Sequence, residues 1–434
     1  MKRILIAGAG HGGLSAALNL AREHFDVTVF EAKARDEIGW DWHDYMQLTT
    51  FDFTGFSRPP QTSYGPGLST GYYNPKKTVL VCTPAPGELS ISIDRKQLYA
   101  HLINECEAAG VRFAFGVSVV GPLSENGRIL GLKISENGVV REERGDLVID
   151  AAGFESPVRS NLPHKCGIHN VISPDDIFTI YRAYFENTTG EISEPPFRVY
   201  FFHCGKPGMD WSITEPGYVD LLIGKFGGRL YDSEISEALA DFRADYPFVG
   251  DKIERGGVIG QIPLKAPLSK LLCDGYAAVG DVAYMTDPMS GSGIDYSLRA
   301  GKLLADAVIA AGDAGYTEET LWAYHYNFFQ MHGNKLVFPA KLRRVMSRLN
   351  AADVDYLMEK GVLGEAELAG GTGNMNTSTL AAKFRSLIPK LPTLLPQLAP
   401  ALSGFTRIDK VAAMLPQTYD PDTVKAWRDA YDAL

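Results

Sequence analysis

The sequence contains few cysteines, no long apolar run and no basic cluster, and each shortage excludes a class of protein. The five cysteines form no CxxC pair and no close cluster that could hold zinc or an iron–sulfur centre, so we predict no metal site. Their small number indicates a reducing compartment. No run of about 20 apolar residues is present, so we expect no helix that spans a membrane. The start MKRILIAGAG lacks the apolar length and cleavage signal of a secretory peptide, which predicts a cytoplasmic protein.

The charge balance excludes nucleic acid as a partner. The formal net charge is −10, and no long lysine or arginine run offsets it locally, so a phosphate backbone would be repelled. Hydrophobic residues make up 45% and charged residues 22% of the 434 positions, which is typical of a folded globular protein. The length predicts two or three domains.

The N-terminal sequence has the pattern of a βαβ unit. Residues 4–7 form a continuous apolar run, which is typical of a parallel strand covered on both faces. A helix from about residue 12 to 23 and a second strand at 27–31 complete the unit. From about residue 39 to 79 the periodicity is lost, which indicates a long excursion.

The later periodicity predicts a discontinuous first domain that encloses a second one. Strands at 178–185, 198–202 and 219–223 indicate a mostly antiparallel sheet. A strand at 276–279 and a helix at 294–311 return to the first domain. We predict an α/β protein with a Rossmann-like nucleotide-binding domain (1–47, 80–165 and 268–330), a substrate domain (48–79 and 166–267) and a helical C-terminal region (331–434).

The first loop has the glycine pattern GxGxxG between the strand and the helix. Gly8 permits a tight turn, Gly10 lets the backbone approach a pyrophosphate, and Gly13 allows close packing of helix on strand. Glu31 ends the second strand and is placed to accept hydrogen bonds from a ribose. With strand, helix and Glu31 in register, the pattern predicts a dinucleotide site. Glycine turns that serve packing alone are the alternative.

Two later segments identify the cofactor by resemblance. DGYAAVGD at 274–281 and DPMSGSGI at 287–294 resemble the second FAD motif of the glutathione-reductase-type flavoproteins, in the branch of the geranylgeranyl reductases and aromatic hydroxylases. The resemblance implies FAD as the cofactor, with Asp281 on the ribityl chain. It also implies that the backbone of 291–294 lies against the pyrimidine edge of the flavin, where a helix N-terminus favours negative charge.

Further segments add to this resemblance. DLVIDAAGFESPVR at 146–159 resembles the "ADGxxSxVR" segment of the branch, with Ala152 in place of the usual aspartate. That aspartate is associated with NADPH handling in the hydroxylases, so its absence favours the reductases. Arg95 matches an arginine that contacts the cofactor, and Val119 matches a strand residue whose backbone meets the adenine. The expected cofactor residues are Gly8, Gly10, Gly12, Gly13, Glu31, Ala32, Arg95, Val119, Gly153, Asp281, Pro288, Gly291, Ser292, Gly293 and Ile294.

The segment expected in the substrate sheet departs from the family pattern. Geranylgeranyl reductases carry PxxYxWxFP there, whereas residues 206–214 keep Gly208 and Trp211 and lack the tyrosine and the Phe-Pro pair. We predict Trp211 and Met209 as substrate contacts, with an ordinary core tryptophan as the alternative.

The loop after Gly39 offers candidate proton donors. The reductases have a cysteine near the flavin here, and Asp44 falls in its position. A hydride delivered to one carbon of a double bond must be matched by a proton at the other, and His43, Asp44 and Tyr45 carry suitable groups. We predict these three residues as catalytic. A surface loop in which Asp44 only bonds His43 or a backbone amide is the alternative.

Three functions fit these motifs. The favoured one is an FAD-dependent oxidoreductase of the geranylgeranyl reductase type that reduces a carbon–carbon double bond of a hydrophobic, isoprenoid-like substrate. A flavin-dependent monooxygenase or oxidase of a small aromatic or lipid is the second, and a flavin-bearing binding or redox-sensing protein is the third. No second GxGxxG is present, so the electron donor is NAD(P)H, ferredoxin or another reduced flavin.

A leucine-rich segment at 387–402 has few charges and four prolines. Its apolar surface suggests peripheral contact with a membrane that holds a lipid-like substrate. The prolines interrupt a long amphipathic helix, which favours the other interpretation, a cover over the substrate domain.

Overall fold

The computed structural model describes residues 1–168, 172–369, 392 and 407–434. Its nucleotide-binding part is built on a six-stranded sheet with the order β18-β19-β12-β1-β2-β8. Every pair is parallel except β18 with β19. The strands are β1 (Arg3–Ala7), β2 (Asp26–Glu31), β8 (Arg112–Phe115), β12 (Leu147–Asp150), β18 (Leu272–Cys273) and β19 (Tyr276–Ala278).

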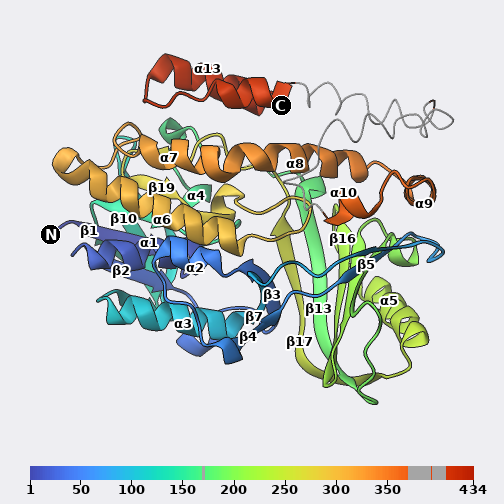
Figure 1. Ribbon diagram of the computed structural model, residues 1–434. Helices are drawn as coiled ribbons and strands as arrows, with labels where there is room; N and C mark the ends of the chain where they lie inside the picture. Colours follow the sequence, from blue (N-terminus) through green and yellow to red (C-terminus); the bar gives the residue numbers. More distant parts are fainter. Residues whose placement is uncertain (169–171, 370–391, 393–406) are drawn as a thin grey trace.

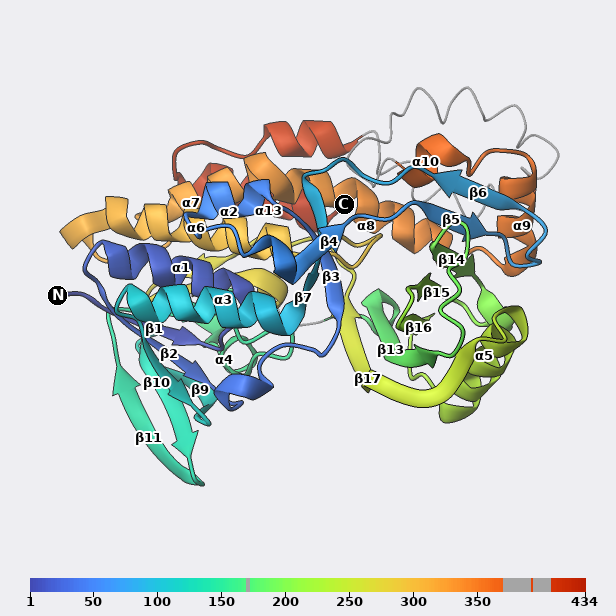
Figure 2. The same cartoon turned by 60° about the horizontal axis from the view of Figure 1, so that its bottom comes forward.

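Helices cover this sheet, and a small antiparallel sheet projects from it, as Figures 1 and 2 show. The small sheet has the order β11-β10-β9. Its strands and the helices are β9 (Ser118–Glu125), β10 (Arg128–Glu136), β11 (Val139–Arg144), α1 (His11–Arg22), α3 (Arg95–Ala108), α4 (Pro157–Ser160) and α6 (Ile294–Ala311). The central strands are buried on both faces, which explains their continuous apolar sequence.

A seven-stranded sheet with the order β17-β13-β16-β15-β14-β5-β6 forms the second part, the one predicted to bind the substrate, with helix α5 (Asp232–Asp245) on one face (Figure 1). Only β14 and β5 pair in parallel. The strands are β5 (Thr70–Tyr73), β6 (Leu80–Thr83), β13 (Ile177–Asn187), β14 (Phe197–Phe201), β15 (Met209–Thr214), β16 (Tyr218–Phe226) and β17 (Val249–Pro263). The mostly antiparallel sheet predicted from the sequence is therefore present.

The segment between the two parts is more ordered than its sequence suggested. It contains the short sheet β3-β7-β4, formed by β3 (His43–Gln47), β7 (Ser90–Asp94) and β4 (Tyr64–Pro66), and helix α2 (Thr49–Thr54).

Two details differ from the predicted domain boundaries. Helix α2, expected in the substrate domain, is bonded to α6, because Thr50 and Arg299 share a hydrogen bond. Strand β6, expected in the nucleotide-binding domain, pairs with β5 in the seven-stranded sheet.

The described C-terminal residues are largely helical, as predicted. They include α7 (Trp322–Phe328), a π-helical turn (Phe329–Gly333), α8 (Asn334–Met346), α9 (Ala351–Glu359), α10 (Glu365–Ala369) and α13 (Pro421–Asp432). Helix α8 extends from the nucleotide-binding part over the seven-stranded sheet (Figure 1). Segment 387–402 lies outside the described residues, apart from residue 392. None of the helices in the described ranges combines the length and hydropathy needed to cross a bilayer.

Candidate active site

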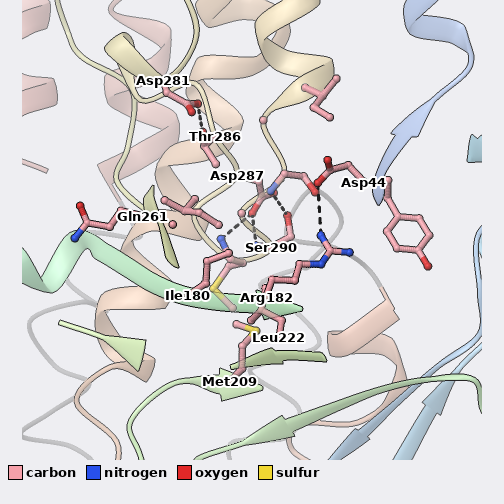
Figure 3. Close-up of a pocket in the computed structure, with 18 of the residues that line it drawn as sticks. Asp44, Ile180, Arg182, Met209, Leu222, Gln261, Asp281, Thr286, Asp287 and Ser290 are labelled. Atoms are coloured by element: carbon pink, nitrogen blue, oxygen red, sulfur yellow. Dashed lines mark hydrogen bonds and ion pairs between the residues drawn. The ribbon is translucent and has the colours of Figure 1, made fainter. Parts of the chain in front are cut away.

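A cavity of about 1010 Å³ connects the two sheets. One end lies at the loop after β1, and the other lies between the seven-stranded sheet and α8. Figure 3 shows the middle, where the loop that carries Asp287 and Ser290 faces Arg182 of β13. The cavity therefore passes from the predicted dinucleotide site to the predicted substrate domain without a break.

The loop after β1 approaches the end of β12 closely. Gly8 has φ +81°, and a Cβ there would lie 2.8 Å from the carbonyl oxygen of Ala151. A Cβ on Gly10 would lie 2.5 Å from the same oxygen. Gly13 lies against Ile6 and Ala151, as close packing of helix on strand requires. These glycines place the start of α1 at the cavity.

Glu31 holds the turn through both carboxylate oxygens. Its Oε2 accepts from the amide of Ala9 at 2.8 Å, and its Oε1 accepts from the amide of Lys33 at 2.9 Å. The carboxylate also lines the cavity. Two backbone amides therefore hold the Glu31 carboxylate in a fixed orientation. A ribose that binds here would donate to this same carboxylate.

The loop before α6 is fixed by its own aspartates. Asp281 Oδ1 accepts from Thr286 Oγ1 at 2.8 Å, and Asp287 Oδ1 accepts from the amides of Met289 and Ser290 at 2.8 and 3.1 Å (Figure 3). Gly291 follows with φ +74°. The loop thereby directs the N-terminus of α6 at the cavity.

The residues present fit FAD. Helices α1 and α6 both begin after a glycine, Gly10 and Gly293, so no N-cap side chain accepts from their first amides. Both N-caps line the same cavity. His11 lines it too, and its Nε2 is buried without a partner among the described residues. Burial, with Arg95 second, lowers the pKa of His11 to about 3, so the imidazole is neutral. The N-terminus of α1, beside the neutral ring of His11, suits the pyrophosphate of FAD. The N-terminus of α6 suits the flavin.

Most of the predicted cofactor residues line the cavity, and five do not. Those at the cavity are Gly10, Gly12, Glu31, Arg95, Gly153, Asp281, Gly291, Ser292, Gly293 and Ile294. Those outside its lining are Gly8, Gly13, Ala32, Val119 and Pro288. Val119 instead pairs with Ile134 in the small sheet. Two positions earlier, the amide of Val117 donates to the carbonyl of Glu31.

Asp44 lies on the face of β3 that meets two arginines. Arg95 Nε forms an ion pair with Asp44 Oδ2, and Arg182 Nη1 lies 4.0 Å from Asp44 Oδ1 (Figure 3). Asp94 caps α3 by accepting from the amide of Gln97 at 2.9 Å, which fixes the helix start that carries Arg95. The Asp44 carboxylate therefore holds the side chains of Arg95 and Arg182. These contacts do not agree with the alternative, a surface loop in which Asp44 bonds only His43 or a backbone amide.

His43 and Tyr45 lie on the opposite face of β3, although both reach the cavity lining. His43 Nε2 lies 3.2 Å from Arg255 Nη1, and burial followed by Arg255 lowers the pKa of His43. Because a guanidinium only donates, the imidazole accepts here and is neutral. Tyr45 stacks on Phe197 with ring centroids 6.1 Å apart, and burial raises the pKa of its phenol. Tyr45 therefore keeps its proton at neutral pH.

Arg182 is a cavity residue that was not predicted from the sequence. Its Nε and Nη2 bind Asp220 at 3.0 and 2.5 Å, and Nη2 also lies 3.0 Å from the Tyr184 hydroxyl. The guanidinium stacks near Trp42 and Trp211, at 5.4 and 5.6 Å from the ring centroids. Only 7% of this side chain is exposed. Its strand carries no sequence motif, so the charge within an apolar run was the only available signal.

The end of the cavity between the seven-stranded sheet and α8 is mostly apolar, and it is the end where we predict the substrate. Met209 and Trp211 both line it, and their contact with a substrate stays a prediction. Helix α8 forms the opposite wall and is held by Arg343, which donates to the carbonyls of Leu264 and Asp175 at 2.9 and 2.8 Å. The apolar lining, which the sequence did not reveal as one surface, comprises Tyr72, Ile180, Phe197, Val199, Phe201, Phe202, Ile213, Leu222, Phe226, Ile262, Leu342, Met346, Val354, Leu363 and Leu368.

Sequence comparisons find relatives along most of the chain. A family model described as an NAD(P)-binding Rossmann-like domain matches residues 6–74. A digeranylgeranylglycerophospholipid reductase of Sulfolobus acidocaldarius is 24% identical over 99% of this chain and 96% of its own length. Another, from Methanococcoides burtonii, is 28% identical over 82% of this chain and 86% of its own length. The predicted family resemblance is confirmed by these relatives.

Solved structures show the same fold. A geranylgeranyl bacteriochlorophyll reductase-like protein of Thermoplasma acidophilum superimposes with a TM-score of 0.73 at 18% identity, covering 92% of this chain and 99% of its own. A myxobacterial FAD-dependent chondrochloren halogenase gives a TM-score of 0.62 at 15% identity, over 89% and 97% of the two chains. The predicted Rossmann-like fold with its antiparallel substrate sheet is confirmed.

Proposed function

We propose that this chain, an FAD-dependent oxidoreductase of the geranylgeranyl reductase type, reduces a carbon–carbon double bond of a hydrophobic, isoprenoid-like substrate. The names of its curated relatives support an isoprenoid chain as the substrate class. Reduced FAD would supply the hydride. The chain's own residues bind the substrate, orient it and provide the proton.

One observation carries this proposal: the apolar end of the cavity adjoins the loop that leads into α6. Ile180, Leu222 and Met209 come from three neighbouring strands and face the same space as Asp287 and Ser290 (Figure 3). Burial of apolar surface is the main driving force for binding a hydrocarbon chain. A substrate held there would place its double bond beside the flavin ring.

Within this proposal the three candidate residues of β3 have different roles. Asp44 holds Arg95 and Arg182 in place. His43 accepts from Arg255 and has no proton to give at Nε2. Tyr45 has a protonated phenol at the cavity, so we assign the proton transfer to Tyr45.

Single-turnover mixing tests the proposal. The holoenzyme is reduced without oxygen and mixed with geranylgeraniol, and flavin reoxidation is followed together with the appearance of the saturated product. Met209→Trp should block the apolar end and abolish reoxidation by the alkene while FAD content is kept. Met414→Trp, at a site that is 40% exposed, is the matched control. Reoxidation by air that the organic substrate accelerates, with no saturated product, would instead indicate a monooxygenase.

The electron donor and the membrane contact belong to the same proposal. NAD(P)H, reduced ferredoxin and free reduced flavin can each be mixed with the oxidised holoenzyme, and the donor is the one that bleaches the flavin within the turnover time. Vesicle co-sedimentation tests membrane contact by comparing the intact chain with a Leu394→Ser, Leu395→Ser, Leu398→Ser variant. Equal sedimentation of both would exclude a contact through this segment.

A further inference from the structure

Arg182 places a charged donor where the apolar lining of the cavity meets Asp44 and Arg95. Its side chain extends from β13 between the rings of Trp42 and Trp211, next to Leu222 on the adjacent strand. Burying a guanidinium costs free energy unless its N–H groups are satisfied. A hydrocarbon chain alone would give this group nothing to bind.

The hydrogen bonds of Arg182 leave one nitrogen free to serve a ligand. Nε and Nη2 are directed to Asp220 and Tyr184. Nη1 makes no hydrogen bond to any residue in the described ranges, and its closest ionic contact is Asp44 Oδ1 at 4.0 Å. Arg182 and Asp44 both line the cavity. One guanidinium nitrogen therefore faces the space beside the loop that leads into α6.

The surrounding charges decide what kind of acceptor fits. Arg182 is balanced by Asp220, and Arg95 is balanced by Asp44, so the four side chains together are neutral. A carboxylate or phosphate at Nη1 would lie close to the Asp44 carboxylate and be repelled. A neutral oxygen acceptor, such as a carbonyl, meets no such penalty.

We propose that Arg182 binds a carbonyl oxygen conjugated to the reacting double bond, so that the substrate is a hydrophobic α,β-unsaturated carbonyl compound. This inference rests on the proposed function and names its substrate class more narrowly. The β-carbon of the substrate takes a hydride from the reduced flavin, which is thereby oxidised. The π pair of the alkene then joins the α-carbon to the carbonyl carbon, and the π pair of the carbonyl moves onto its oxygen, where Arg182 Nη1 stabilises the negative charge. Tyr45 then donates its phenolic proton to the α-carbon and regains one from solvent, so two hydrogens have been added across the double bond.

In this position Arg182 would stabilise the transition state in addition to binding the substrate. A donor aimed at an oxygen that becomes negative in the transition state lowers the barrier more than it strengthens ground-state binding. The aromatic rings around Arg182 exclude water from the guanidinium, which strengthens that interaction. An isolated alkene has no oxygen in this position and gains nothing from Arg182.

Geranial and geraniol test the inference because they share one carbon chain and differ in the conjugated carbonyl. Reduced holoenzyme is mixed anaerobically with each, and binding of each to the oxidised holoenzyme is titrated by flavin absorbance. We expect geranial to reoxidise the flavin at least about 100-fold faster than geraniol. Arg182→Lys, which keeps the charge opposite Asp220, should remove this preference and weaken geranial binding. Arg198→Lys on the same sheet is the matched control, because Arg198 is outside the cavity lining and bonds Tyr246.

The outcomes separate this inference from the proposed function. Equal rates for geranial and geraniol, or an equal effect of Arg182→Lys on both, would overturn the carbonyl assignment and leave the ene reduction standing. Reoxidation by neither compound, with tighter binding of geranial that depends on Arg182, would support the carbonyl site and refute the reduction. Neither turnover nor selective binding would refute both.

Discussion

Gly12 of α1 and Gly301 of α6 meet so closely that a Cβ on Gly301 would lie 2.1 Å from the Gly12 carbonyl oxygen. The same Cβ would lie 2.8 Å from the Ser15 Cβ. This contact fixes the separation of the two helices whose N-termini line the cavity. Gly301→Ala should push them apart, lower the free energy of unfolding by about 2 kcal/mol and weaken FAD binding.

Urea unfolding and FAD retention on gel filtration measure this effect. Gly217→Ala is the control, because Gly217 is exposed and a Cβ added there would meet no atom within 4 Å. A Gly301→Ala variant with the stability and FAD content of the parent would show that the two helices separate without cost.

Arg343 of α8 and Asp176 form a buried ion pair that fastens the cavity wall. Burial lowers the pKa of Arg343, and Asp176 opposes this effect. Asp176→Asn would remove the carboxylate that Arg343 shares with Arg344, so we expect a loss of about 3 kcal/mol of unfolding free energy. Thermal unfolding measures it, with Asp175→Asn as control, because the Asp175 side chain is exposed and its hydrogen bond to Arg343 comes from the carbonyl. Similar losses in both variants would exclude a specific role for the ion pair.

The sequence predicted those elements of the fold that carry their own periodicity. The helix expected at 294–311 is α6 with the same bounds, because its apolar spacing follows directly on a glycine-rich loop. Strand β17 (Val249–Pro263) was not predicted, since its charged residues and glycines hide the alternation. Its stability comes from pairing with β13 along its length, which is a tertiary contact that no local pattern encodes.

The residues of the candidate site were also only partly predictable from the sequence. Gly10, Asp281 and Gly291 were found from motifs because backbone approach demands particular residues at fixed spacings. Arg182 and Arg343 were not found, because their partners Asp220 and Asp176 are distant in sequence and the pairs form only in the folded chain. Asp44 was located from its place in the family pattern, and its contacts to the two arginines are the reason why we propose a positioning role for it in place of the predicted proton transfer.

The buried side chain of His325 should lower the stability of the folded protein at acid pH. It is fully buried between Trp322 and Phe329, with ring centroids 4.5 and 4.7 Å away, and neither ring nitrogen has a partner in the described ranges. Burial, followed by Arg428 and Lys270, lowers the pKa of His325 well below its usual value. The unfolded chain therefore binds a proton near pH 6.5 that the folded chain does not, so stability falls as the pH drops below that value.

His325→Phe should remove this one proton from the pH dependence. Between about pH 6.5 and 5 the parent should lose up to about 1.4 kcal/mol per pH unit more than the variant. Urea unfolding at about pH 7.5, 6.5 and 5.0 gives the difference, with His325→Leu as a second variant in case phenylalanine overfills the site. His164→Phe, at an exposed histidine, is the control. Parallel curves for parent and both His325 variants would mean that this ring takes up its proton in the folded state.

We predict that the phenol of Tyr45 donates the proton to the substrate. Its phenol keeps its proton because burial raises its pKa, and its stacking on Phe197 places it where β3 meets the substrate sheet. Tyr45→Phe keeps the ring and removes the acid, so we expect substrate-dependent flavin reoxidation to slow roughly 100-fold, with FAD content and substrate affinity unchanged. The parent should show a solvent deuterium isotope effect on this step. Tyr73→Phe, on the β5 residue that stacks on Tyr200, should leave the rate unchanged.

The comparison with the neighbouring residues makes this assignment specific. His43→Ala should alter the rate little, because Nε2 accepts from Arg255. Asp44→Asn weakens the pair with Arg95 and should lower FAD affinity and rate together, with the isotope effect unchanged. Only Tyr45→Phe should lower the rate without changing FAD content and abolish the isotope effect. If the isotope effect survives in Tyr45→Phe and disappears in Asp44→Asn, the proton comes from the carboxyl group, and the ion pair with Arg95 must open during turnover.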